Sequence, residues 1–184
     1  MKKIFLTTIF ITFSLISNSQ NFKELFKQVE KFDTQEQFDS ADKDIQKAVD
    51  YLLTHKYNEK SSNYFYALKS MIKWMDGTNK YAIIIGGKLT EDIGKKTLMM
   101  NMYMAGMAKF LLNERFENNR YLLIPKLKEG EKFNELDIVR IIQIKGAENF
   151  FDYLKNFSGE KPDKKLKKGF RKYEKGQIYQ YMFD

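Results

Sequence analysis

The sequence has no cysteine, a single histidine and only two prolines among its 184 residues. The absence of cysteine excludes disulfide bonds, zinc ribbons, iron–sulfur clusters, thiol nucleophiles and a lipidated N-terminal cysteine. The single histidine excludes metal sites that need several imidazole ligands. Few prolines together with 15% aromatic residues exclude a disordered or collagen-like chain. We therefore expect a folded protein without a cofactor.

Apolar residues make up 43% of the chain and charged residues 30%, and the mean hydropathy is −0.54. This balance excludes a membrane protein with several spans, while the apolar share is large enough for a hydrophobic core. At this length one domain is the default. Because no linker divides the sequence, we expect a single domain.

The first twenty residues have the pattern of a secretory signal. Lys2 and Lys3 precede an apolar stretch from Ile4 to Ile16, and the small residues Ser17 and Ser19 follow. Thirteen helical residues reach about 20 Å, less than the roughly 30 Å of a bilayer core, which favours cleavage over a retained anchor. We expect a signal peptide over 1–19, a mature domain over 20–184, no transmembrane span after cleavage, and a location in the periplasm or outside the cell.

Helical periodicity dominates the mature chain. The pattern predicts five or six helices. The first helix is marked by an apolar stripe from Phe22 to Phe32, and the second by an N-cap at Ser40 and a stripe ending near His55. The third has an N-cap at Ser61 or Ser62, is ended by a left-handed Gly77, and has an apolar face of Tyr64, Phe65, Leu68, Met71, Ile72 and Met75. A long helix from Thr90 to about Glu114 follows, then a helix from Asn134 to Gly159 that is interrupted or kinked near Gly146, and a last helix that starts at Pro162.

Two segments do not follow this periodicity. The β-branched run 81–87 is too short for a helix, so it is a short strand or an extended plug. Segment 118–133 is irregular or a weak hairpin. The predicted fold is all-α: a single-domain bundle or short superhelix whose helix pairs have the general shape of tetratricopeptide-like hairpins.

Several short segments carry a resemblance. Phe38-Asp39, Ala67-Leu68, the stretch from Trp74 to Thr78 and Tyr103-Met104-Ala105 resemble a group of small exported helical proteins of Gram-negative bacteria. The resemblance implies a helical fold and a location in the cell envelope. It implies no activity and no site residues.

The usual catalytic motifs are missing: there is no Gly-x-Ser-x-Gly, His-Glu-x-x-His or Gly-x-Gly-x-x-Gly. His55 has the residue type of a general base, but it follows a helix end, where the helix dipole already favours a histidine. Glu148 and Asp152 stand one helical turn apart, as a catalytic carboxylate pair or a solvated helix face would. We expect the structural role for all three residues.

Five methionines fall between Met99 and Met107, and Met100, Met104 and Met107 share one helix face. Thioethers bind Cu(I), so these three residues are a candidate soft-metal site. A helix that is apolar over most of its circumference is also typical of a central core helix, where methionine fills irregular gaps. We expect the core role.

The C-terminal region carries a run of cations on one arc of a predicted helix, opposite an apolar stripe of Leu166, Phe170 and Tyr173. The cations are Lys164, Lys165, Lys167, Lys168, Arg171, Lys172 and Lys175. Such an arc is a solvated outer face or a contact surface for anionic lipid or an acidic partner. We expect salt-sensitive binding to anionic vesicles, abolished when Lys168, Arg171 and Lys172 are reversed to glutamate.

Charge is uneven along the chain, because the segment from Asn21 to Asp50 holds eight acids against five bases. This asymmetry indicates either an electrostatic role for one end or contact between the two ends. The leading functional prediction is an exported, non-catalytic binding or scaffolding protein of the cell envelope. Its partner is an unknown envelope protein or an anionic surface, and the export signal argues against nucleic acid. The alternatives are an envelope hydrolase with a site assembled from scattered residues, and Cu(I) handling.

Overall fold

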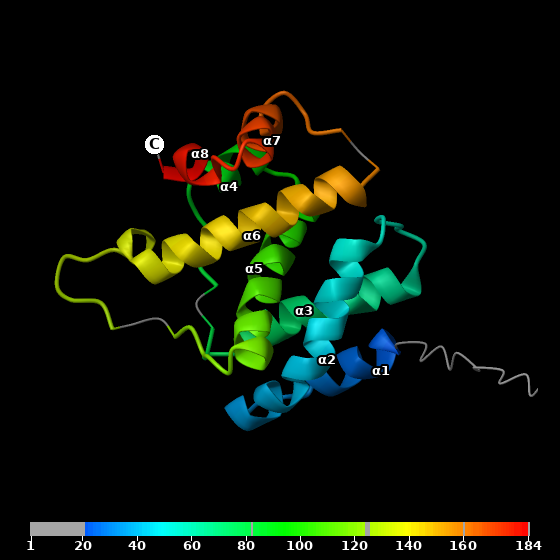
Figure 1. Ribbon diagram of the computed structural model, residues 1–184. Helices are drawn as coiled ribbons and strands as arrows, with labels where there is room; N and C mark the ends of the chain where they lie inside the picture. The colour runs from blue at the N-terminus through cyan, green and yellow to red at the C-terminus, as the bar shows by residue number, and fades with distance from the viewer. Residues whose placement is uncertain (1–20, 82, 124–125, 160, 184) are drawn as a thin grey trace, which may run out of the picture.

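The computed structural model describes residues 21–81, 83–123, 126–159 and 161–183, so the predicted signal peptide lies outside the described residues. The fold is all-α, as predicted, and none of the described residues forms a strand. Figure 1 shows the helices in order. They are α1 (Phe22–Val29), α2 (Gln35–Thr54), α3 (Ser62–Gly77), α4 (Lys88–Ile93), α5 (Thr97–Glu117), the 3₁₀ turn η1 (Phe133–Glu135), α6 (Asp137–Asn156), α7 (Leu166–Glu174) and α8 (Ile178–Phe183).

The start of α2 differs from the prediction. Thr34, not Ser40, is the N-cap: the Gln37 backbone N–H donates to the Thr34 hydroxyl, and the Gln37 side chain accepts from the Thr34 N–H. This reciprocal capping box precedes Phe38, which is buried. Ser40 lies inside the helix and donates its hydroxyl to the Gln37 carbonyl. The predicted apolar stripe of α2 is confirmed, because Ile45, Val49 and Leu52 are fully buried.

Helix α3 begins after Ser61, whose hydroxyl accepts from the Tyr64 N–H at 3.2 Å, so one of the two predicted caps is confirmed. The predicted apolar face is wrong in part. Phe65 and Ile72 are exposed, and the buried face also contains Ala67, Ser70 and Trp74.

Gly77 ends α3 without a left-handed conformation, contrary to the prediction. Its role is close packing, because a Cβ there would lie 1.9 Å from the Phe38 ring.

The predicted long helix from Thr90 to Glu114 is two helices. Thr90 lies within α4, and its hydroxyl donates to the Gly86 carbonyl rather than capping a helix. Gly94 ends α4 with a φ of +61°, a conformation that only glycine adopts readily. A similar break at Gly176, with a φ of +66°, separates α7 from α8. These two breaks explain why the described residues form eight α-helices instead of five or six.

Helices α5 and α6 form the most extensive helix contact in the molecule and cross at two glycines. A Cβ on Gly106 would lie 2.4 Å from the Gly146 carbonyl oxygen, and a Cβ on Gly146 would lie 2.3 Å from the Met107 Cγ. Gly146 therefore permits close packing, and the predicted interruption there is wrong because α6 is continuous. The predicted cap at Asn134 is also wrong, since α6 begins at Asp137 after the η1 turn.

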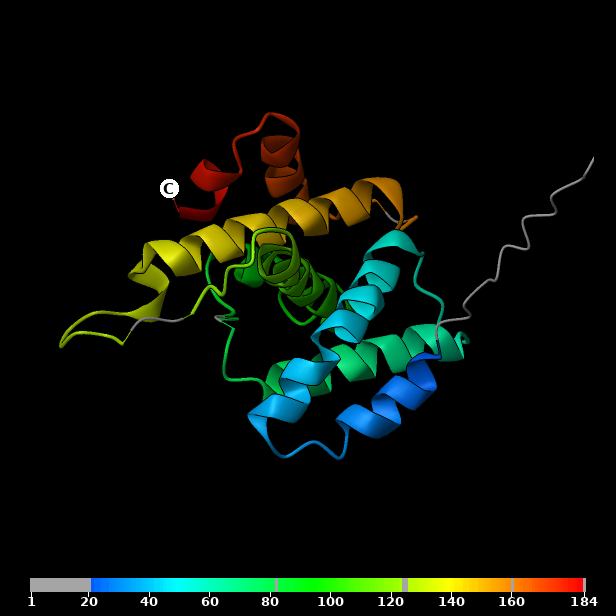
Figure 2. The same ribbon diagram turned by 60° about the horizontal axis from the view of Figure 1, so that its bottom comes forward.

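The described part of segment 81–87 forms no strand: Tyr81 is buried, Ile83 packs against the core and Ile85 is exposed. The Gln143 amide of α6 donates to the Ile84 carbonyl at 3.0 Å. Within 118–123 and 126–132 the chain is irregular. Figures 1 and 2 show α1, α2 and α3 on one side of α6 and α4, α7 and α8 on the other. The C-terminal helices are thereby held on the face of α6 remote from the acid-rich helix α2.

Candidate functional site

The basic helix α7 is positioned at its start by Asp163. The Asp163 carboxylate accepts from the backbone N–H groups of Leu166 (2.9 Å) and Lys165 (3.0 Å), and it pairs with the Lys96 ammonium. These hydrogen bonds, first that of Leu166 and then that of Lys96, lower the pKa of Asp163. The predicted start at Pro162 is wrong, because α7 begins four residues later, at Leu166, after a turn over 164–165.

The apolar side of α7 packs on the protein's own core, which confirms the predicted stripe. Leu166 is buried, and the rings of Phe170 and Tyr173 lie 6.0 Å and 5.8 Å from the ring of Phe151 on α6. Gly169 allows this contact, since a Cβ there would lie 2.5 Å from the Tyr181 ring. The orientation of α7 is therefore fixed, with its basic arc turned away from the core.

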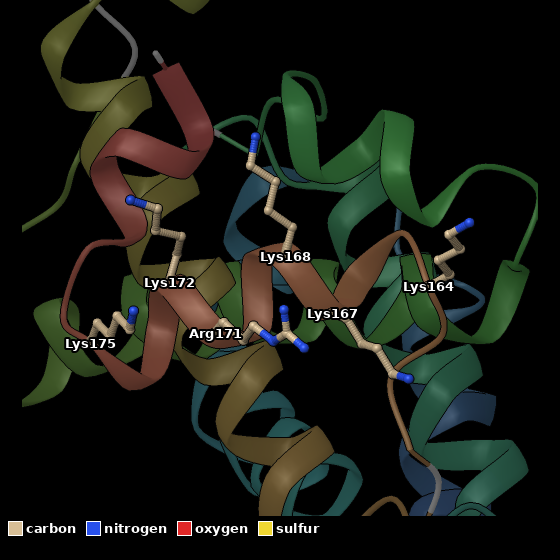
Figure 3. A pocket seen from close by; sticks show the side chains of 6 residues that line it. All are labelled: Lys164, Lys167, Lys168, Arg171, Lys172 and Lys175. Atoms are coloured by element: carbon tan, nitrogen blue, oxygen red, sulfur yellow. The ribbon is translucent and has the colours of Figure 1, made fainter.

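The cations gather in a shallow hollow of about 390 Å³ along the outer side of α7 (Figure 3). Six of the seven predicted cations line it: Lys164, Lys167, Lys168, Arg171, Lys172 and Lys175. Lys165 is exposed but does not line the hollow. Lys172 is half-buried and donates to the Gln177 side chain at 3.0 Å, whereas the other five lining cations are exposed.

A second hollow, of about 290 Å³, contains the predicted carboxylate pair. Asp152 accepts from the Tyr173 hydroxyl at 3.2 Å and the Asn156 amide at 2.9 Å, while Glu148 pairs with Lys145 at 2.7 Å. Burial, followed by the Asp152 charge, raises the pKa of Tyr173 to about 12. The two acids are thus engaged in surface contacts, as the solvated-face interpretation predicts. The sequence gives no sign of this hollow because its other walls come from the α7–α8 turn.

His55 is the C-cap of α2, as its position after a helix end predicted. Its ring stacks on Tyr51 at 4.1 Å, and its Nδ1 lies 3.0 Å from the Tyr51 carbonyl oxygen and 3.1 Å from the Thr54 hydroxyl. These contacts are local to one helix end. His55 does not line either of the two hollows, so neither hollow places it beside a carboxylate.

The three candidate thioethers differ in burial. Met107 is fully buried against Gly146, whereas Met100 and Met104 are half-buried at the edge of the core. Met102, which the Cu(I) hypothesis does not include, is also fully buried and accepts from the Tyr64 hydroxyl at 3.3 Å. Helix α5 therefore behaves as a core helix at Met102 and Met107.

Sequence reasoning missed a buried polar cluster around Asp42. The Asp42 carboxylate accepts from the Trp74 indole N–H at 2.9 Å and from the Tyr81 hydroxyl at 2.5 Å. Burial raises the pKa of Asp42, although both hydrogen bonds act in the opposite direction. On the inner face of α2, Asp42 stands between apolar residues, and this position in the sequence was the signal from which its burial could have been predicted.

Within the part of the chain that the structure describes, no group of three or more histidine, aspartate or glutamate side chains could hold a metal ion. No helix over the same residues is both long and apolar enough to span a bilayer. The chain matches no protein-family model, no curated protein and no solved structure. The basic hollow on α7 is consequently the feature on which a functional proposal can be built.

Proposed function

We propose that the chain is an exported, non-catalytic scaffold that attaches to an anionic membrane surface through the basic hollow of α7. The observation that carries this proposal is the gathering of six cations on the outer side of a helix whose inner side is packed on the core. Each basic residue near an anionic surface contributes about 1 kcal/mol of attraction. An acidic envelope protein would use the same electrostatics.

Packing favours peripheral attachment over insertion. The apolar residues of α7 are occupied by Phe151 and Tyr181, so the helix has no free apolar face to bury in lipid. Attachment should therefore depend on charge and weaken as salt is added. Export and the location in the cell envelope belong to the same proposal, and they rest on the pattern of residues 1–19.

The scaffold itself is formed by the two layers on either side of α6. We propose that α2 and α3, which pack extensively and are joined by the short connection 55–61, form a hairpin of tetratricopeptide-like general shape. The hydrolase alternative gains no support from His55, because its ring nitrogen is placed against groups of its own helix end.

Vesicle binding tests the proposal. Wild-type mature chain should bind anionic vesicles at low salt, lose binding as salt rises, and ignore neutral vesicles. The variant Lys167→Glu, Lys168→Glu, Arg171→Glu should lose more than about a hundredfold in affinity, because three reversals remove at least about 3 kcal/mol. Lys172 is left in place because it holds Gln177.

A matched control separates local from net charge. Lys23, Lys31 and Lys60 are exposed, lie far from α7 in sequence, and form no ion pair within the described residues. Reversing these three residues changes the net charge equally and should leave most of the binding intact. Equal loss in both triple variants, or absence of binding by a folded wild-type chain, contradicts the proposed lipid surface.

A further inference from the structure

The lining cations form a straight row. They occupy positions i, i+3, i+4, i+7, i+8 and i+11 from Lys164 to Lys175, which places them on one side of a helix. At 1.5 Å per residue the row is about 17 Å long. Figure 3 shows the six side chains spaced along α7, with Lys168 and Lys167 pointing to opposite sides of the row, and all six line the same hollow.

Among the residues that the structure describes, no acid lines this space. The nearest acid in sequence at its start, Asp163, is already held by two backbone N–H groups and by Lys96. Among the lining cations only Lys172 donates to another side chain of the described residues, and that acceptor is the neutral amide of Gln177. The six lining cations therefore have no ion-pair partner among the described residues, and an anion with several charges would relieve their repulsion.

The size and chemistry of the hollow restrict the ligand. About 390 Å³ lies at the lower end of small-molecule sites, which are usually apolar, whereas this lining is formed by five lysines and one arginine. Lysine binds phosphate as a point charge, and arginine binds it through a two-pronged pair of hydrogen bonds. A row of such groups suits several phosphates held close together better than single charges spread over a surface.

We propose that the hollow of α7 is a site for a lipid headgroup that carries two or more closely spaced phosphate groups. This inference rests on the proposed membrane attachment and deepens it from a general attraction to a selective one. Arg171, the single guanidinium among the lining cations, would bind one phosphate through a two-pronged pair of hydrogen bonds, and the lysines beside it would neutralise the others.

Two kinds of vesicle of equal surface charge test the inference. One contains cardiolipin, with two phosphates in each headgroup, and the other contains phosphatidylglycerol at twice the mole fraction. Wild-type chain should bind the cardiolipin vesicles at least about fivefold more tightly, the factor that one further lysine–phosphate contact supplies. Soluble tripolyphosphate should compete for both.

Lys165 provides a matched control for Lys168. The two side chains are exposed on the same helix turn, but only Lys168 lines the hollow. Lys168→Glu should reduce the cardiolipin preference to about one, whereas Lys165→Glu should weaken binding to both vesicles and keep the preference. Thermal unfolding of each variant confirms that the fold is intact.

The outcomes separate this inference from the proposed membrane attachment on which it rests. Equal wild-type binding to the two vesicles without binding of tripolyphosphate, or equal loss of preference in the two variants, overturns the clustered-phosphate site and leaves general anionic attachment standing. Absence of binding to every anionic vesicle overturns both. Lys168-dependent binding of tripolyphosphate without cardiolipin preference overturns the lipid as the source of the phosphates.

Discussion

Asp42 is the residue whose surroundings differ most from those of an ordinary surface acid. It is 3% exposed and joins α2 to Trp74 of α3 and to Tyr81 of the following segment. Its two donors compensate the carboxylate only in part, since burial still raises its pKa. The nearby charges of Asp39 and Arg115 act in opposite directions, the first raising the pKa and the second lowering it.

This raised pKa predicts a pH dependence of stability. Above the unfolded value of about 3.9, the unfolded chain releases a proton that the folded chain still holds. The free energy of unfolding therefore falls as pH rises through the interval between the unfolded and folded pKa values. Asp42→Asn keeps an acceptor for Trp74 and removes this titration, so its stability relative to wild type should increase as pH rises above about 4.

Denaturant unfolding at a series of pH values measures this difference. Asp44→Asn is the control, because Asp44 lies on the same helix, is exposed and pairs only with Lys47 at the surface. Parallel pH curves for wild type and Asp42→Asn would show that Asp42 titrates as it does in the unfolded chain.

At the scale of elements, the crossing of α5 and α6 organises the molecule. Met107 lies at this crossing and is fully buried against Gly146. Met107→Ala should lower the free energy of unfolding by about 2–5 kcal/mol, the range for large-to-small changes in a core. Met104→Ala should cost less, because Met104 is half-buried. Denaturant titration of the two variants gives both values.

The Cu(I) alternative predicts a different property of helix α5. A thioether site requires stoichiometric withdrawal of copper from a Cu(I) chelator by folded protein. Such withdrawal, lost in Met104→Ala while the fold persists, would contradict a purely structural role for the methionines. We expect no withdrawal, because Met107 is enclosed by α6.

Periodicity predicted which segments are helical but not where several of them begin and end. The Thr34–Gln37 capping box was present in the sequence, yet Ser40 offers the same hydroxyl, and only tertiary packing of Phe38 and Gly77 selects the earlier start. On α3, apolar residues cover two adjoining faces, so sequence spacing alone does not select the buried one.

Exposed aromatic residues explain the misassigned face of α3. The Lys69 ammonium lies 5.1 Å from the Phe65 ring centroid and 5.6 Å from that of Phe26, which gives both rings a polar cover at the surface.

The candidate site was easier to predict. A row of cations can be predicted from helical spacing alone, and the structure was needed only to show that Lys165 does not line the hollow.

At the scale of the whole molecule, the two ends of the chain carry opposite charge and lie apart. The acid-rich helix α2 and the basic helix α7 are on opposite sides of α6 (Figures 1 and 2). Within the described residues, no ion pair joins the α7 row to residues 21–50. The asymmetry therefore favours an electrostatic role for α7 over contact between the ends, and it would orient the molecule with α7 toward an anionic surface.

That orientation has a functional meaning only if the chain reaches a membrane surface outside the cytoplasm. Residues 1–19 have the pattern expected of an export signal, and their thirteen-residue apolar stretch, which as a helix would reach about 20 Å, is short for a permanent anchor. Intact-mass measurement on protein from its native host should show loss of the first nineteen residues, with or without cyclisation of Gln20. The mature chain would then keep 30 basic and 24 acidic residues, a net charge of +6.

Fractionation distinguishes the two ways in which the protein could be held at a membrane. A cleaved chain attached through α7 should leave washed membranes when salt is raised, because its attraction is electrostatic. A full-length chain that stays in the membrane fraction at high salt would instead show an uncleaved apolar anchor, and the basic row would then be unnecessary for attachment. Mass and salt release measured on the same sample decide between these outcomes, because the proposal requires a chain that is both cleaved and released by salt.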